Sequence, residues 1–342
     1  MIKEEENSGR ISNLTKKTVK FFTSRVFCYS LLSQVAALGL FGLGVAVDNA
    51  GTSKFPSLPS FMAFCVHFTL TLIFLPYFVY HNSFKEVIKR NWWRYLLTSF
   101  CEVQGTYLIE LSYNYANYIV VQFLDYSCIV FAFIFSLIIL KKKFYLFHFV
   151  GAAITVGGIV MLTLYDINGD YSVFSERNDK YFKYFGESMS LVGCLMYALS
   201  TVLSEKFLAD ASSFEWLTFQ GLFSMGIALI QGIILELIWP NEIKITFSTT
   251  MWVLLYVVCS VSFYSICPFV FLALGAARSN LFYTSADIMA VIYSSHHKQR
   301  MTVIFGVSLL LAVLGNTMFS IQTMYQEERM KKRTHAPTET SI

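Results

Sequence analysis

The sequence is divided into about ten long apolar runs, and this division constrains the fold more than any other feature. Each run is close to 20 residues, the length that an α-helix needs to cross the hydrocarbon core of a bilayer. Because 55% of the 342 residues are hydrophobic and only 14% are charged, the sequence predicts an all-α polytopic membrane protein. The expected spans are residues 26–47, 60–80, 95–113, 118–140, 146–165, 185–207, 217–239, 250–274, 280–295 and 303–323.

Basic residues gather on one side of the predicted membrane. With both termini in the cytosol, 19 of the 26 Lys and Arg residues fall in cytosolic segments, as the positive-inside rule expects. All five tryptophans fall at predicted span ends, where the ring prefers the headgroup zone. Asn13 begins a glycosylation triplet in the N-terminal tail, which opposes this orientation, but such triplets often arise by chance. The sequence therefore favours cytosolic termini.

The longest polar gap between spans leaves five spans on each side. Because five is odd, the second half must be inverted relative to the first, which is the plan of many transporters with inverted repeats. The fourth and ninth spans support this plan, since Asp125 and Asp287 each follow an asparagine near the span start. The predicted organisation is a cytosolic tail (1–25), a first five-helix repeat (26–165), a non-cytosolic loop (166–184), a second five-helix repeat (185–323) and a cytosolic tail (324–342).

Polar side chains share helix faces on the third and fourth spans. Glu102 and Glu110 lie on one side of the third span, and Tyr118, Gln122 and Asp125 follow i, i+4, i+7 spacing on the fourth. The turn between these spans is short, so Glu110 could approach Asp125, and two such carboxyl groups can hold an exchangeable proton. Charged groups at membrane depth usually mark a polar pathway. The predicted solute or proton pathway comprises Asp125, Gln122, Glu102, Glu110, Asp287, Tyr118 and Asn114.

A purely structural role is the alternative for each of these acids. Glu102 and Glu110 could pair with Arg94 or accept hydrogen bonds from Tyr and Ser neighbours. Asp287 could pair with Arg278, nine residues earlier in the sequence. Asp125 has no Lys or Arg within its span to neutralise it, so it is the strongest candidate for a functional group.

Other polar residues of the spans have simpler interpretations. Asn114 and Gln122 are interpreted first as hydrogen-bonding groups between helices and second as solute contacts. His67, alone on the second span, is interpreted as a satisfied polar group rather than a ligand. Glu236 lies near a span end, where it is expected to meet water.

Several short segments resemble a known family of transporters. They are WWRY at 92–95, VQFLD at 121–125, FHFVG at 147–151 and SAD at 285–287. These stretches are similar to those of solute carrier family 35, subfamily F, in the drug/metabolite transporter superfamily. The resemblance implies ten spans in two inverted repeats, cytosolic termini and alternating-access carriage of a small polar organic solute. It also implies that Glu102, Gln122, Asp125 and Asp287 occupy positions where the family places polar groups.

The sequence departs from this pattern after the aspartate of the ninth span. Residues 294–300 read SSHHKQR where an apolar continuation is expected, which leaves a span of about 16 residues. This short span puts full transport competence in question. His296 and His297 are interpreted as a loop feature, because a metal site would need more ligands.

The polar residues of the interior also bear on the substrate. A nucleotide-sugar carrier should offer basic residues to the pyrophosphate, but Lys and Arg occur only at span ends. The interior is acidic and amide-rich, and 17% of all residues are aromatic. These features favour a neutral or cationic solute such as a nucleobase, a nucleoside or a vitamin-like compound. A nucleotide-sugar transporter and a transport-dead scaffold or receptor remain the alternatives.

Other classes of protein find little support in the sequence. Neither an H-E-x-x-H nor a G-x-S-x-G pattern is present, so no catalytic residues are assigned and an enzyme is not expected. All seven cysteines lie in or beside apolar runs and are interpreted as small buried hydrophobes, so neither a metal nor a cofactor is expected. The basic residues form no nucleic-acid groove. The expected partners are a small solute and membrane lipid, and a homodimer is compatible with the chain.

Overall fold

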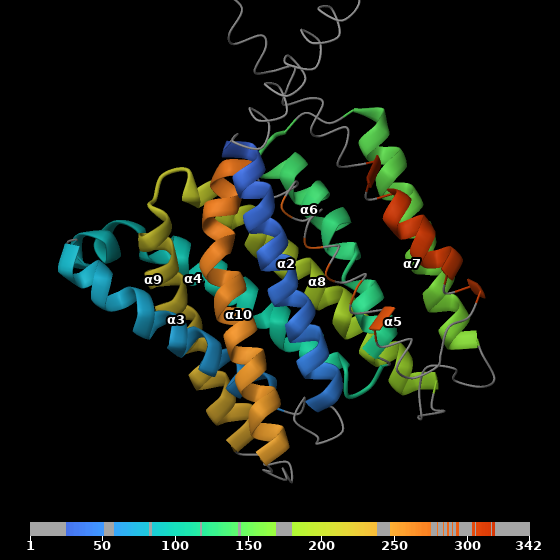
Figure 1. Ribbon diagram of the computed structural model, residues 1–342, viewed down its shortest axis with the longest axis horizontal. Helices are drawn as coiled ribbons and strands as arrows, with labels where there is room; N and C mark the ends of the chain where they lie inside the picture. Colours follow the sequence, from blue (N-terminus) through green and yellow to red (C-terminus); the bar gives the residue numbers. More distant parts are fainter. Residues whose placement is uncertain are drawn as a thin grey trace, which may run out of the picture.

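Within the residues that the computed structural model describes, all regular elements are helices, joined by short turns (Figure 1). These are residues 25–50, 58–81, 84–116, 118–142, 145–168, 180–237, 247–274 and 306–315, with a few single positions between 279 and 318. The helices are α2 (Arg25–Ala50), α3 (Pro59–His81), α4 (Phe84–Ser112), α5 (Tyr118–Leu124), α6 (Ser127–Ile138), α7 (Leu146–Asn168), α8 (Lys180–Leu208), α9 (Ser213–Gly232), the π-helical turn η3 (Ile233–Leu237) and α10 (Phe247–Leu274).

Six segments are long and apolar enough to cross a membrane, judged by their length and composition. Only a third to a half of the most apolar window in each segment is buried inside the molecule. Large apolar side chains such as Leu72, Phe147 and Val258 are therefore exposed on the outer faces of the helices, as expected of surfaces that contact lipid. The six segments are Pro59–Tyr80, Val120–Ile138, Leu146–Tyr165, Tyr184–Leu208, Ser213–Glu236 and Thr250–Ala273.

The fourth predicted span, residues 118–140, is not one continuous helix. It is divided into α5 and α6 by a turn at Asp125 and Tyr126. The amides of Tyr126 and Cys128 bond carbonyls only three residues earlier, at 3.3 and 3.0 Å, so the helix tightens locally. Asp and Ser side chains compete with the backbone for hydrogen bonds and lower helix propensity, and the local sequence is Leu-Asp-Tyr-Ser. The predicted span is confirmed over Val120–Ile138, and the turn at Asp125 and Tyr126 interrupts its helix.

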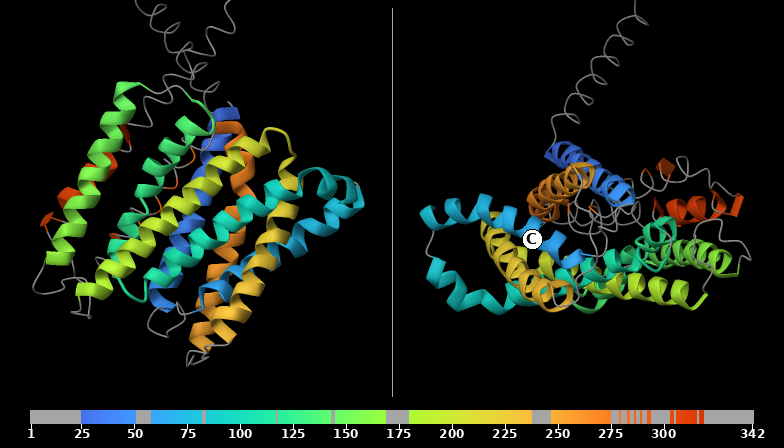
Figure 2. Two further views of the ribbon diagram at one scale, coloured as in Figure 1. Left: turned by 180° about the vertical axis from the view of Figure 1, so that it is seen from behind. Right: turned by 90° about the horizontal axis from the view of Figure 1, so that it is seen from below.

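Three helix pairs organise the packing. In the view from behind, α4 and α8 run side by side (Figure 2). The helices α2 and α10 form a second pair, and α3 packs along α9. Glycines permit close approach in the first two pairs. A Cβ atom on Gly105 of α4 would lie 2.8 Å from the Tyr197 nitrogen of α8, and one on Gly42 of α2 would lie 2.7 Å from the Cys259 sulfur of α10.

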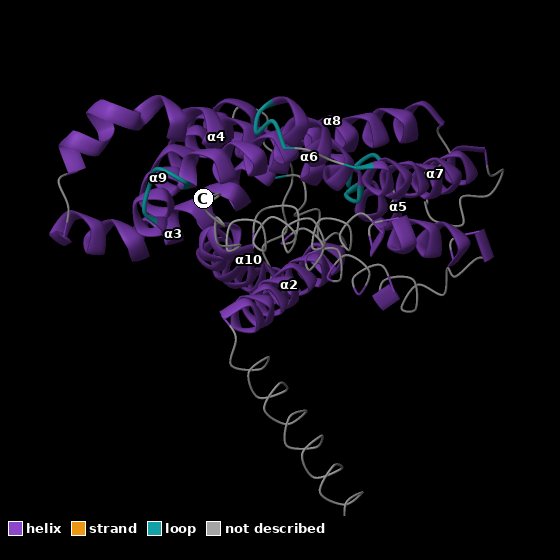
Figure 3. Cartoon of the chain, turned by 90° about the horizontal axis from the view of Figure 1, so that it is seen from above, coloured by secondary structure: helices purple, strands orange, loops and turns teal. Residues whose placement is uncertain are grey.

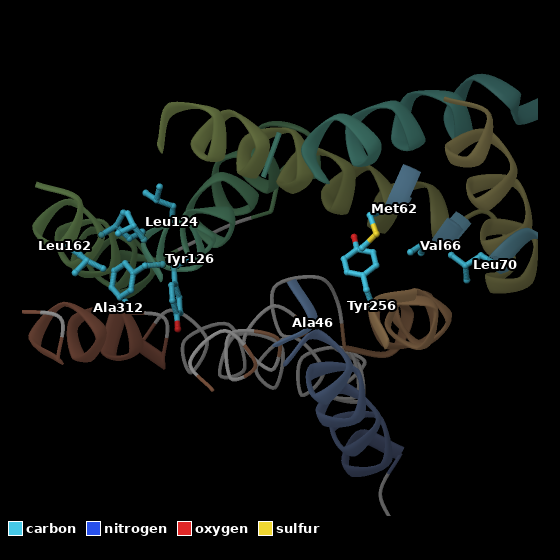
Figure 4. Close-up of a cluster of buried hydrophobic side chains, with 12 residues drawn as sticks. Ala46, Met62, Val66, Leu70, Leu124, Tyr126, Leu162, Tyr256 and Ala312 are labelled. Atoms are coloured by element: carbon cyan, nitrogen blue, oxygen red, sulfur yellow. The ribbon is translucent and has the colours of Figure 1, made fainter. Parts of the chain in front are cut away.

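The pairs form two sides of the molecule. Figure 3 shows α2 and α10 on one side and α4, α6 and α8 on the other. A buried apolar cluster supports the turn between α5 and α6: Leu124 and Tyr126 lie with Leu162 of α7 and Ala312 (Figure 4). Leu124 and Tyr126 are each only 1% exposed. This packing holds the turn between α5 and α6 in place.

Candidate functional site

A central cavity of about 180 Å³ lies where α2, α4, the α5–α6 turn, α8 and α10 meet. Its polar groups include the carboxyl groups of Glu110 and Asp125 and the amide of Gln122. The first half of the chain supplies these three groups. The second half supplies mainly aromatic and hydroxyl groups. Six tyrosines line the cavity, namely Tyr113, Tyr126, Tyr197, Tyr256, Tyr264 and Tyr283.

Asp125 lies at the turn that interrupts the fourth span and faces the central cavity. Its Oδ1 atom accepts a hydrogen bond from the Cys194 thiol of α8 at 3.3 Å. The Cys194 thiol also lies 3.7 Å from the Leu124 carbonyl. The ion pairs that the structure records among the described residues involve other acids, Asp210 and Glu205. Asp125 is thus held by a weak neutral donor, which leaves its carboxyl group available to a solute or a proton.

Glu110 and Gln122 are held by tyrosines. Tyr256 of α10 donates a hydrogen bond to Glu110 Oε1, and the two residues are separated by 146 positions in the sequence. Gln122 Nε2 donates to the hydroxyl of Tyr113 at 3.0 Å. Glu110 and Asp125 line the same cavity, as their spacing suggested, although no direct hydrogen bond between them is recorded. The contact between Glu110 and Tyr256 joins the two halves of the chain at the cavity wall.

Glu102 faces a different space. It lines a side cavity of about 40 Å³ among α3, α4, α8, α9 and α10. Gln220 Nε2 of α9 donates a hydrogen bond to Glu102 Oε2, and Ser224 Oγ lies 3.5 Å from the same atom. Arg94 instead pairs with Asp210 at 3.3 Å. The alternative of a pair between Glu102 and Arg94 was therefore wrong, because Arg94 is paired with Asp210 in the α8–α9 connection.

The remaining predicted site residues have varied positions. Asn114 lies in the turn after α4 and is not among the residues that line the central cavity. The side chain of Tyr118 and the whole of Asp287 lie outside the described residues. Glu236 does not meet water as expected. It is only 9% exposed, and its carboxylate accepts hydrogen bonds from backbone amides at the start of α3.

The sequence interpretation missed the contribution of the eighth span to the site. Tyr256, Ser260 and Tyr264 are spaced by four residues and line the central cavity from α10. That spacing was visible in the sequence as one polar stripe on an apolar helix. Cys194 was also missed, because a lone cysteine in an apolar run gives no local signal of a contact with Asp125. Among the described residues, no group of three or more His, Cys, Asp or Glu side chains could hold a metal ion.

Comparison with known proteins identifies relatives of the whole membrane region. A family model described as SLC35F, solute carrier family 35, matches residues 22–321. A solute carrier family 35 member of Schizosaccharomyces pombe is 25% identical over 289 residues, which are 83% of this chain and 56% of that protein. Solute carrier family 35 member F2 of Mus musculus is 25% identical over 285 residues, 82% of this chain and 75% of the relative. The Xenopus tropicalis member F2 is 23% identical over 331 residues, 93% and 83% of the two chains.

A solved protein crystal structure shares the fold. It superposes with a TM-score of 0.61 at 14% sequence identity, and the match covers 89% of this chain and all of the other. The chain spans only about half the length of the fission yeast relative (56%). The comparisons therefore concern the helical region that contains both cavities.

Proposed function

The chain belongs to the SLC35F group of solute carrier family 35, and from this premise we propose that it carries a small polar organic solute by alternating access. Membership makes it a multi-pass membrane transporter and not an enzyme. In this proposal the central cavity is the solute site. Asp125, Glu110 and Gln122 are its polar contacts, and the tyrosines are its stacking surfaces.

The observation that supports this proposal is the chemistry of the central cavity. Its described lining contains two carboxyl groups, an amide and six tyrosines, and none of these lining residues is Lys or Arg. Tyrosine faces attract cations and stack on planar rings. A cavity of roughly 150 Å³ can hold benzene, so a volume near 180 Å³ admits a compound with one or two small rings. A neutral or cationic nucleobase, nucleoside or vitamin-like compound fits these properties best.

A nucleotide-sugar substrate fits the same cavity poorly. Its pyrophosphate would meet the carboxyl groups of Glu110 and Asp125, and like charges at close range in a site of low dielectric constant repel strongly. Arg and Lys are the usual ligands of phosphate groups. We therefore keep a nucleotide sugar as the second candidate. A transport-dead scaffold is the candidate from another class.

Alternating access requires two similar halves that can move relative to each other. Exchanging the halves would map α2 onto α8, α3 onto α9 and α4 onto α10. Under this exchange the α4–α8 pair becomes the α10–α2 pair, and the α3–α9 pair is unchanged. This symmetry of packing supports two inverted five-helix repeats over 26–165 and 185–323, joined by a non-cytosolic loop at 166–184. Tails 1–25 and 324–342 are then both cytosolic in our proposal.

The experiment that tests the function is uptake of a metabolite panel into vesicles. The panel contains nucleobases, nucleosides, vitamins and nucleotide sugars, and the vesicles carry wild type or Asp125→Asn at matched expression. Asp210→Asn is the matched control, because it makes the same chemical change at an exposed position that is not part of the cavity lining. We expect a compound that wild type and Asp210→Asn accumulate and Asp125→Asn does not. Equal uptake by all three proteins across the panel would argue for the scaffold.

A further inference from the structure

The side cavity contains two buried polar groups from different helices. His67 of α3 is 4% exposed and Glu102 of α4 is 2% exposed, and both line the cavity. His67 Nδ1 and Glu102 Oε1 are fully buried, and neither has a hydrogen-bond partner among the described residues. A buried polar atom without a partner is costly and calls for a specific explanation, such as a water molecule or an ion.

The side cavity has room for water. Its volume is about 40 Å³, and one water molecule needs roughly 10–15 Å³ measured in this way. Water in this space would meet two polar partners, the imidazole nitrogen of His67 and a carboxyl oxygen of Glu102. Two to four such partners are what a stable buried water requires.

We propose that the side cavity is a proton-binding site, in which water links His67 Nδ1 to Glu102 Oε1 and the pair takes up and releases one proton during transport. The proton comes from bulk water. It converts the Glu102 carboxylate to the acid or the neutral His67 ring to the imidazolium, and it returns to bulk water on the other side of the membrane. The coupling part of this proposal rests on the proposed transport function. It assigns solute binding to the central cavity and proton binding to the side cavity.

The donor set favours a proton over a metal cation. Sodium-like hard cations prefer several oxygen ligands, whereas an imidazole nitrogen and one carboxyl oxygen are typical of proton relays in membrane proteins. The hydroxyl of Ser200 is already committed to the carbonyl of Thr98 at 3.1 Å, and that of Thr201 to the carbonyl of Ala198 at 2.9 Å. Each hydroxyl oxygen keeps lone pairs that a cation could use, so the sodium control in the infrared titration below distinguishes a proton from a metal cation.

The groups that surround the pair are mostly neutral. Helix α8 presents Tyr197 to the side cavity, and α10 presents Tyr264 and Cys267. Helix α9 presents Gln220, which donates to Glu102, and no acid or base of α9 is among the described lining residues. Glu110, the other acid of α4, lines the central cavity instead. Apart from Glu102, no Asp, Glu, Lys or Arg is among the described residues that line the side cavity, so no second fixed charge beside the pair changes its affinity for a proton.

Two tyrosines connect the proposed proton site to the solute site. Tyr197 and Tyr264 line both cavities. The Tyr264 ring lies beside the His67 ring, with centroids 5.4 Å apart. A change in the charge of His67 or Glu102 changes the environment of Tyr264, and Tyr264 in turn forms part of the central cavity. Protonation in the side cavity can therefore alter solute binding in the central cavity through Tyr264.

The first arm of the test needs no solute. The full-length protein in liposomes is titrated with acid while infrared spectroscopy follows the carbonyl stretch of protonated carboxyl groups. We expect one component of the pH-dependent band to be missing in Glu102→Gln, while the components of the other carboxyl groups remain. The same component should be displaced along the pH axis in His67→Gln and retained in Asp210→Asn. A band that survives unchanged in both Glu102→Gln and His67→Gln would overturn the proton site. A band that responds to added sodium at constant pH would overturn it in favour of a metal cation.

The second arm uses the compound that wild type accumulates. A gradient of one pH unit can sustain about a tenfold accumulation of a solute carried with one proton. We expect wild type and Asp210→Asn to approach this ratio, and Glu102→Gln to fall to about onefold while still exchanging labelled for unlabelled compound at equal pH. Accumulation that is unchanged in Glu102→Gln would overturn the coupling. A protein that shows the infrared band but carries no compound keeps the proton site and loses the transport function, so the two failures are distinguishable.

Discussion

The carboxylate of Glu236 caps the first turn of α3. Its Oε1 atom accepts a hydrogen bond from the Ser60 amide at 2.6 Å, and its Oε2 atom accepts one from the Phe61 amide at 3.0 Å. The first amides of a helix have no partner within the helix, and a negative charge is favourable at this end. The contact joins residues that are 176 positions apart. It therefore ties η3 in the second half of the chain to the second span of the first half.

We predict that Glu236→Ala destabilises the protein by about 1–2 kcal/mol, because the buried Ser60 amide and the partly buried Phe61 amide lose a charged acceptor. The apparent unfolding midpoint in detergent measures the effect. Glu236→Gln should lie between wild type and Glu236→Ala, since its amide oxygen can accept one of the two bonds. Glu86→Gln, which removes an exposed acid from the first turn of α4, is the control for loss of charge alone. Equal midpoints for Glu236→Ala and this control would show that the cap contributes nothing.

We expect Tyr256→Phe to cost about 1–3 kcal/mol, because it leaves a buried carboxyl group of Glu110 without its donor. A double-mutant cycle with Glu110→Gln separates this pair from the general effect of each change. The cycle is measured by unfolding midpoints and by solute uptake. Tyr145→Phe removes a hydroxyl group from an exposed ring and should have little effect. Additive effects of the Tyr256 and Glu110 changes would contradict the inferred contact.

We predict opposite effects on stability for two glycine-to-alanine substitutions, one at the contact of α4 with α8 and one on α9 where no neighbour lies near. Gly105→Ala should destabilise, because the new Cβ would lie 2.8 Å from the Tyr197 nitrogen and 3.0 Å from the Gly193 carbonyl. Gly226→Ala on α9 meets nothing within 4 Å, so it should stabilise by about 0.5–1 kcal/mol through its better helix propensity. Thermal unfolding of the two variants provides the comparison. A stable Gly105→Ala protein would mean that the two helices lie further apart than the structure places them.

The sequence predicted those features that depend on local spacing. Apolar run lengths located the six of the ten predicted spans that the described residues confirm as long and apolar enough to cross a membrane, because lipid offers no partner to an exposed backbone and the helix must cross completely. The i, i+4 and i, i+3 rules placed Gln122 and Asp125 together, and both line the central cavity. The same rule grouped Glu102 with Glu110, which do share the α4 helix. They line two different cavities, and Tyr197 and Tyr264 line both of these cavities.

Local spacing in the sequence could not predict contacts between residues that are far apart in the chain. The partner of Glu110 is 146 residues away, and the thiol that bonds Asp125 is 69 residues away. Cys194 has the local pattern of an ordinary apolar-run residue, and the polar stripe that contains Tyr256 does not identify Glu110 as its partner. The break at Asp125 was also missed, because hydropathy measures the length of a span and not the continuity of its hydrogen bonds. Tertiary packing decides these features, so only a structure could reveal them.

The proposed orientation predicts where tags are accessible. Arg94 pairs with Asp210 at 3.3 Å and Lys142 with Glu205 at 2.5 Å, so these basic residues belong to one end of the helices. The positive-inside rule assigns that end to the cytosol. We expect tags at either terminus to be reached by antibodies once the plasma membrane alone is permeabilised. A tag inserted between residues 169 and 179 should not become accessible on the cytosolic side under that condition.

The glycosylation triplet at Asn13 provides an independent check of the same orientation. A cytosolic N-terminal tail is not exposed to the glycosylation machinery, so we expect no change in electrophoretic mobility after glycosidase treatment. A new Asn-x-Thr triplet placed in the 169–179 segment is the positive control, because that segment is non-cytosolic in the proposed topology. A mobility shift that depends on Asn13, or antibody labelling of an N-terminal tag on intact cells, would reverse the orientation. The ends of the helices that we assign to the cytosol would then lie on the opposite side of the membrane.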